Sequence, residues 1–223
     1  MFKKRPYSSY NMFFIIPFIL WVVTGSIILY YADKGTVFRL VNTHYSAIGD
    51  VLMYYMTWVG EGVFITATLI SMMVFVPTFR NWWYFITAAL CNGIPPLVSQ
   101  WVKHAMNKPR PLKYFNGADW IHMQPNWEKL FTQSFPSGHT TGAFAMFCFF
   151  AMLLPEKSKR LGLLFFVLAV GVGYSRMYLA AHFFQDVYFG SILGTGLSIL
   201  FFAVMNLMKP YFFKEHKQAR IRS

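Results

Sequence analysis

Six uncharged, largely apolar runs divide the sequence, and they constrain the fold more than any other feature. A helix that crosses the hydrocarbon core of a bilayer, roughly 30 Å thick, needs about 20 such residues. The runs are Met12–Ala32, Gly62–Phe79, Asn81–Val102, Ser137–Pro155, Leu161–Ser175 and Val187–Met208. With 56% hydrophobic residues, the chain is also too apolar for an ordinary soluble domain. We therefore predict an all-α integral membrane bundle of six transmembrane helices, with residues 1–223 forming a single membrane-embedded domain.

Between the first two runs, apolar residues recur every three or four positions. They are Phe38, Val41, Tyr45, Ile48 and Leu52. This spacing places them on one face of a helix, while Arg39, Asn42 and Asp50 lie elsewhere around it. The pattern predicts an amphipathic helix at the membrane interface before the second span.

The distribution of Lys and Arg predicts the orientation in the membrane. If the six runs are all spans, twelve of the 20 Lys and Arg residues fall on the side of the two termini. The positive-inside rule then places both termini in the cytoplasm. The first run is longer than the apolar core of a signal peptide and has no small-residue cleavage site before Asp33, so we expect a retained span. We predict a multi-pass protein of an inner (plasma) membrane, bacterial in view of its compact size.

The net charge of +12 would suggest nucleic acid as a partner of a soluble protein. Here the basic residues lie in short loops and tails, where anionic lipid and the positive-inside rule account for them, so we predict no nucleic-acid partner. Cys91 and Cys148 both fall within apolar runs and are expected to be buried free thiols. The sequence leaves the oligomeric state open.

Three short segments at the ends of these runs carry polar residues of a kind that handles phosphate. They are Lys103 with Arg110-Pro111, then Pro136-Ser137-Gly138-His139, then Ser175-Arg176 with His182 and Asp186. In the predicted topology all three lie on the outer, periplasmic face. We therefore expect them to form one site there.

Hydrolysis of a phosphate ester needs cations around the phosphoryl oxygens, an in-line nucleophile and an acid for the leaving oxygen. Lys103, Arg110 and Arg176 are the candidate cations, and Arg offers paired donors to phosphate. Backbone N–H groups of Ser137, Gly138 and His139 at a helix start would add an anion site, with the serine hydroxyl as a further donor.

His182 and Asp186 are four residues apart, which places them on one face if the segment is helical. The carboxylate would then hold a proton on one imidazole nitrogen and leave the other free to attack phosphorus, giving a phosphohistidine. His139 would protonate the leaving oxygen and later deprotonate water. This chemistry needs no metal and no cofactor, and a metal site at Asp50 and Glu61 lacks a matching set of ligands.

In order and spacing, the three segments resemble the complete signature of the type 2 phosphatidic acid phosphatase superfamily, in its membrane lipid phosphatase branch. The resemblance runs residue by residue from about position 100 to position 190. It implies a helical membrane fold, His182 as nucleophile, His139 as acid and base, and Lys103, Arg110 and Arg176 as phosphate ligands. Substrates of the family that fit are undecaprenyl diphosphate, phosphatidylglycerol phosphate, phosphatidic acid and the phosphates of lipid A.

Three other functions are open to a chain of this kind. A lipid phosphotransferase would use the same phosphoenzyme and pass the phosphoryl group to a lipid acceptor. A vanadate-dependent haloperoxidase has a similar anion pocket, but members of the family with that activity are soluble. A transporter or non-catalytic lipid-binding protein would have no use for the nucleophile, the acid and the three cations together. The sequence favours a metal-independent lipid phosphatase whose partners are the bilayer and a lipid phosphate.

Overall fold

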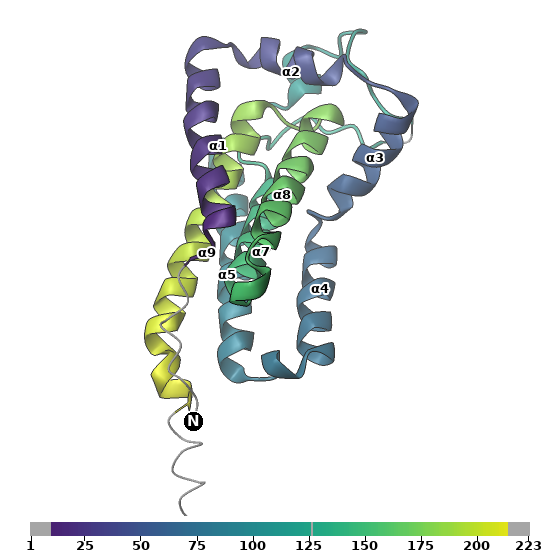
Figure 1. Cartoon of the computed structure of the whole chain (residues 1–223). Coiled ribbons are helices and arrows are strands. Elements are labelled where there is room, and N and C mark those ends of the chain that lie inside the picture. The colour runs from purple at the N-terminus through teal and green to yellow at the C-terminus, as the bar shows by residue number, and fades with distance from the viewer. Residues whose placement is uncertain (1–9, 126, 214–223) are drawn as a thin grey trace, which may run out of the picture.

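A computed structural model of the chain describes residues 10–125 and 127–213, which form helices and connecting segments without a strand. The main helices are α1 (Met12–Tyr31), α2 (Lys34–Asn42), α3 (Ala47–Trp58), α4 (Gly62–Phe75), α5 (Trp82–Met106), α6 (Pro111–Tyr114), α7 (Gly138–Leu153), α8 (Leu161–Tyr178) and α9 (Phe184–Phe213). The 3-10 turns η1 (Pro77–Phe79) and η2 (Glu156–Ser158) lie between them. The long helices form an elongated bundle (Figure 1). The prediction of an all-α fold is confirmed for the described residues.

Helix α7 is the centre of the bundle. All but one of its residues from Thr140 to Met152 are buried, and its most extensive contacts are with α9, α8 and α5. Gly190 allows α9 to approach the start of α7, because a Cβ atom there would lie 2.8 Å from the carbonyl oxygen of Ser137. Small residues that permit such close contact are typical of helix packing in membranes.

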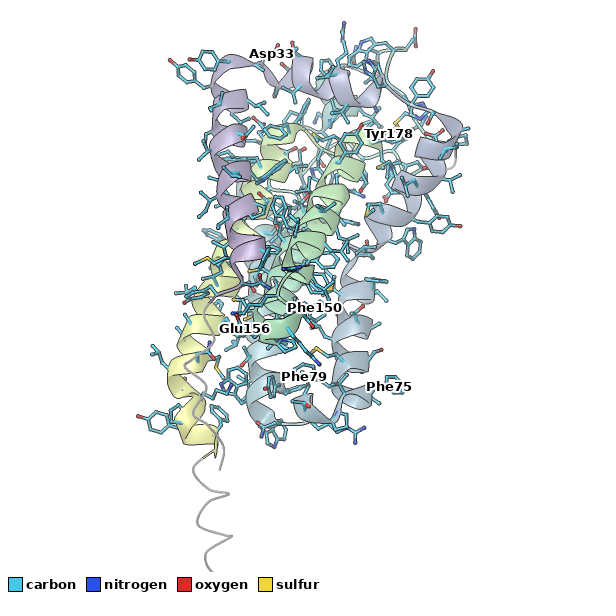
Figure 2. The ribbon with its side chains drawn as sticks, viewed as in Figure 1. Asp33, Phe75, Phe79, Phe150, Glu156 and Tyr178 are labelled. Atoms are coloured by element: carbon cyan, nitrogen blue, oxygen red, sulfur yellow. The ribbon has the colours of Figure 1, made fainter. Side chains whose placement is uncertain are left out.

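The bundle has two distinct ends. Asp33 and Tyr178 lie at one end, and Phe75, Phe79 and Glu156 lie toward the other (Figure 2). At this second end the indole Nε1 of Trp83 donates to the carbonyl of Met205 at 2.7 Å, so the start of α5 lies beside the end of α9. The end of α5, the start of α7, the end of α8 and the start of α9 therefore meet at the end marked by Tyr178.

Three helices of the described chain, α1, α8 and α9, are individually long and apolar enough to cross a membrane. The pair α3 and α4, bent by 60° at a short break, could provide a fourth span. The predicted run Gly62–Phe79 is a helix only to Phe75, since Pro77 lacks the N–H that would continue it. Helix α7 is apolar but has 16 residues, and α5 has 25 residues but is less apolar. The membrane character is supported, and the count of six spans stays a prediction.

The predicted amphipathic helix is divided into α2 and α3. The break falls at Thr43–Ser46, where the Ser46 side chain caps the N-terminus of α3 by accepting from the N–H of Gly49. The expected apolar face is divided with it. Phe38 is fully buried against Phe115 and Phe183, whereas Ile48 is 83% exposed. The structure therefore contains two shorter helices here in place of one continuous interfacial helix.

Candidate active site

The first predicted segment supplies two buried cations from the end of α5 and the loop that follows. Lys103 lies in the last turn of α5, which ends at Asn107 in the left-handed conformation. Arg110 is held by backbone carbonyls, since its Nε donates to the oxygen of Thr132 at 2.7 Å and its Nη1 to that of Ala181 at 3.1 Å. Lys103 and Arg110 are 7% and 8% exposed. Both side chains are therefore buried within the protein, and the carbonyl acceptors also fix the position of Arg110.

The second segment forms the N-terminus of α7. Ser137 is its N-cap, and its Oγ accepts hydrogen bonds from the N–H and the hydroxyl of Thr140. Because Oγ accepts both, its own hydrogen stays free to donate to an anion. The backbone N–H of Ser137 donates to the carbonyl oxygen of Asp186 at 2.9 Å, so it is not the free donor that the sequence suggested. At the next position, a Cβ on Gly138 would lie 3.4 Å from Nζ of Lys103, so this glycine permits the close approach of the ammonium group.

The third segment joins α8 to α9. Arg176, 3% exposed, lies in the last turn of α8, and its carbonyl accepts from the N–H of His182 at 3.1 Å. His182 lies in the linker before α9 and not within a helix, so the helical spacing expected for it and Asp186 does not apply. The two are still close, with 3.5 Å between Nδ1 of His182 and Oδ2 of Asp186. The tight turn into α9, and not one helical face, brings them together.

Asp186 is fully buried and is positioned by its own partners. Its Oδ2 accepts from the hydroxyl of Ser134 at 2.5 Å and from the N–H of Phe183 at 2.9 Å. On the opposite side of the imidazole, Nε2 of His182 lies 3.4 Å from Nη1 of Arg110. The imidazole therefore has the Asp186 carboxylate beside Nδ1 and the Arg110 guanidinium, a group that commonly binds phosphate, beside Nε2.

The surroundings of His182 favour its neutral form. Burial is the largest cause that lowers its pKa well below the usual imidazole value, and Arg110, Arg176, Lys103 and His139 act in the same direction. A neutral imidazole has the lone pair that a nucleophile needs.

The neighbours of His182 and the contacts described above also show that the eight predicted site residues lie together at one end of the bundle.

Two residues of the α3–α4 junction contact the site, and neither belongs to the three predicted segments. The hydroxyl of Thr57 accepts from Nη1 of Arg176 at 2.7 Å, and Oε2 of Glu61 lies 2.7 Å from Nε2 of His139. Both contacts join positions far apart in the chain. The only signal in the sequence was a carboxylate between two glycines, Gly60 and Gly62, at the edge of an apolar run.

Asp50 and Glu61, the carboxylates near the apolar runs, are paired with other side chains. Asp50 accepts from Tyr178 and lies 2.7 Å from Nε2 of His122, while Glu61 pairs with His139. Residues 10–125 and 127–213 contain no group of three or more His, Cys, Asp or Glu side chains that could hold a metal ion. Cys91 and Cys148 are buried free cysteines, as predicted.

Known structures share this architecture. LpxE of Aquifex aeolicus superposes with a TM-score of 0.63 at 24% identity, covering 78% of this chain and 96% of that one. A PAP2-type phosphatidylglycerolphosphate phosphatase from Bacillus subtilis also superposes with a TM-score of 0.63, at 21% identity, covering 87% of this chain and 95% of that one. At these identities the likeness shows the fold.

Curated relatives are named as lipid phosphatases. A lipid A 1-phosphatase of Rhizobium etli is 26% identical over 81% of this chain, and the match spans 63% of that relative. An undecaprenyl-diphosphatase of Sulfolobus acidocaldarius is 29% identical, over 73% of this chain and 74% of the relative. Phosphatidylglycerophosphatase B of Bacillus subtilis is 30% identical, over 69% of this chain and 72% of the relative. The PAP2 superfamily model matches residues 81–209, which include all three segments. The chain therefore belongs to the PAP2 superfamily, the type 2 phosphatidic acid phosphatases that its three segments resemble.

Proposed function

We propose that this protein is an integral membrane lipid phosphatase that removes a terminal phosphate from a lipid phosphate or diphosphate through a phosphohistidine at His182. The observation that carries the proposal is the setting of the His182 ring, with Asp186 beside Nδ1 and Arg110 beside Nε2. A phosphoryl group held by Arg110 would lie next to the nitrogen that can attack it.

In the first half-reaction, Nε2 of His182 forms a bond to phosphorus while the bond from phosphorus to the ester oxygen breaks. His139 gives its proton to that oxygen, so a lipid phosphate releases a neutral alcohol and a lipid diphosphate releases a protonated lipid phosphate. Lys103, Arg110 and Arg176 surround the phosphoryl oxygens and stabilise the charge in the transition state. The first-turn N–H groups of Gly138 and His139, which helix geometry leaves without partners within α7, and the Ser137 hydroxyl add donors.

In the second half-reaction, His139 takes a proton from water, whose oxygen forms a bond to phosphorus. The bond between phosphorus and Nε2 breaks, which releases inorganic phosphate and neutral His182. Asp186 orients the imidazole and stabilises the positive charge that the ring carries as a phosphohistidine. The scheme uses no metal and no cofactor, so activity is expected to persist in a chelator.

The names of the relatives support the proposed substrate class. The named relatives act on lipid A, undecaprenyl diphosphate and phosphatidylglycerophosphate, and all three are amphiphiles with a terminal phosphate. Phosphatidic acid is a fourth candidate of the same chemistry. Phosphate release across this panel from the purified protein in detergent is the test, with His182→Ala and His139→Ala in parallel. Unchanged release in both variants would refute the proposal, and phosphorylated lipid in place of free phosphate would indicate a phosphotransferase.

For the topology, we propose six spans in an inner (plasma) membrane, with cytoplasmic termini and a periplasmic site. The spans would be α1, α4 with part of α3, α5, α7, α8 and α9. Asp119 and Lys157 are exposed near opposite ends of the bundle. A cysteine at Asp119 should react with an impermeant thiol reagent in intact cells, and one at Lys157 only after lysis. The reverse pattern would overturn the orientation.

A further inference from the structure

His139 has a partner outside the three motif segments. Its Nε2 lies 2.7 Å from Oε2 of Glu61, at the break between α3 and α4. The Glu61 side chain is 45% exposed and that of His139 is 27% exposed, so the pair lies at the open side of an otherwise buried site. A contact of this length is a hydrogen bond between a ring N–H and a carboxylate.

The chain at this break fits closely against His139. A Cβ atom at Gly60 would lie 2.6 Å from Cγ1 of Val172, 2.9 Å from the carbonyl oxygen of His139 and 3.1 Å from its Cβ. Three residues earlier, Thr57 accepts from Arg176 and is 2% exposed. The segment Thr57–Glu61 therefore contacts the site at two places, and backbone packing fixes the position of Glu61.

The charges around His139 explain what this carboxylate would do. Arg176 on α8 and Lys103 on α5 act on the ring, and His182 in the linker before α9 is also near. Two cations disfavour a protonated imidazole, whereas a general acid must carry its proton to the leaving oxygen. Glu61 is a carboxylate in contact with the ring, and its charge opposes the effect of the two cations. It would also hold a proton on Nε2, so that Nδ1 exchanges the proton with the substrate and with water.

We propose that Glu61 is a positioning residue for the general acid and base His139, matching the role of Asp186 toward His182. The proposal rests on the proposed function, because it assigns a partner to a group of that mechanism. In the first step Nδ1 of His139 releases its proton to the leaving oxygen while Nε2–H stays bonded to Glu61. In the second step Nδ1 accepts a proton from water, and the imidazole of His139 becomes positively charged again.

The test is Glu61→Gln, which keeps shape and removes charge. For a short-chain phosphatidic acid in detergent micelles, kcat/KM should fall about 10- to 100-fold, which is part of the ~10²–10⁴ that a general acid contributes. The alkaline limb of its pH profile should move to lower pH. For 4-nitrophenyl phosphate, whose leaving group departs without a proton, kcat/KM should change less than about threefold. Glu61→Asp should recover part of the activity on the lipid.

Glu156→Gln is the matched control, because Glu156 is an exposed carboxylate at the other end of the bundle, paired with Lys159. Glu156→Gln should leave kcat/KM for both substrates and the pH profile unchanged. Equal losses on both substrates, or an unchanged pH profile in Glu61→Gln, would contradict the role of Glu61. If His182→Ala and His139→Ala lose activity while Glu61→Gln does not, this inference fails alone. If neither histidine variant loses activity, the proposed function fails.

Discussion

Replacement of Asp186 by Asn separates the catalytic role of this carboxylate from its structural role. Oδ2 accepts two hydrogen bonds, from Ser134 and Phe183, in a fully buried position. An Asn side-chain oxygen can accept both, so the loss of stability should be limited to the weaker bonds of a neutral acceptor, about 1–2 kcal/mol. Asp186→Ala would leave both donors buried without a partner, at a cost of about 2–6 kcal/mol.

The catalytic effect of Asp186→Asn should be larger than its structural effect. Without the charge beside Nδ1, the phosphohistidine and the transition state that leads to it lose their counter-ion. We expect kcat to fall about 10²- to 10⁴-fold, which is roughly 2.7–5.4 kcal/mol in the barrier. The assay is phosphate release in detergent, with the melting temperature measured on the same preparation. Ser134→Ala keeps the carboxylate and should lose less than about tenfold. Activity of Asp186→Asn within threefold of the parent protein would refute the reasoning.

Four further predictions follow from the packing and the charges. Gly190→Ala should destabilise the bundle by about 1–3 kcal/mol, because the new Cβ would lie 2.8 Å from the carbonyl oxygen of Ser137. Gly196→Ala has open space around the new Cβ and should be neutral or stabilising. Equal melting temperatures of the two variants would contradict this. Thr57→Val leaves a buried Arg176 N–H without its acceptor, so kcat/KM should fall several-fold. An unchanged kcat/KM would count against the contact. Because burial and neighbouring cations lower the pKa of His182, the ring should stay neutral as the pH falls through 6.5, and a histidine NMR titration that assigns His182 an ordinary pKa would contradict it. Excess EDTA should leave phosphate release unchanged, and a loss restored by one added metal would overturn the metal-independent scheme.

The sequence was most informative where local spacing determines structure. The apolar runs correspond to long helices, and Ser137 is the N-cap expected from its position. The three polar segments meet at one end of the bundle because helix lengths and short turns return the chain there. Local patterns of this kind depend on neighbours within a few residues, so they can be predicted without knowing the fold.

The site contacts that could not be predicted depend on packing between distant segments. Glu61 and Thr57 reach His139 and Arg176 only because α3 and α4 bend against α7 and α8. The backbone N–H of Ser137 is occupied by a carbonyl oxygen of α9, which no spacing rule would reveal. The break at Thr43–Ser46 was also missed, because a periodic apolar pattern does not show where a polar cap will interrupt it.

Trapping the phosphoenzyme is the most direct test of the central claim. In His139→Ala, 4-nitrophenyl phosphate can still phosphorylate the nucleophile without a general acid, while hydrolysis of the intermediate lacks its base. The intermediate should therefore accumulate and be recovered after rapid quenching as an acid-labile, alkali-stable phosphate on His182, identified by mass spectrometry. The same trapping with His139→Ala combined with His182→Ala should give no such adduct. Phosphate on another residue, or equal labelling in the double variant, would contradict the account.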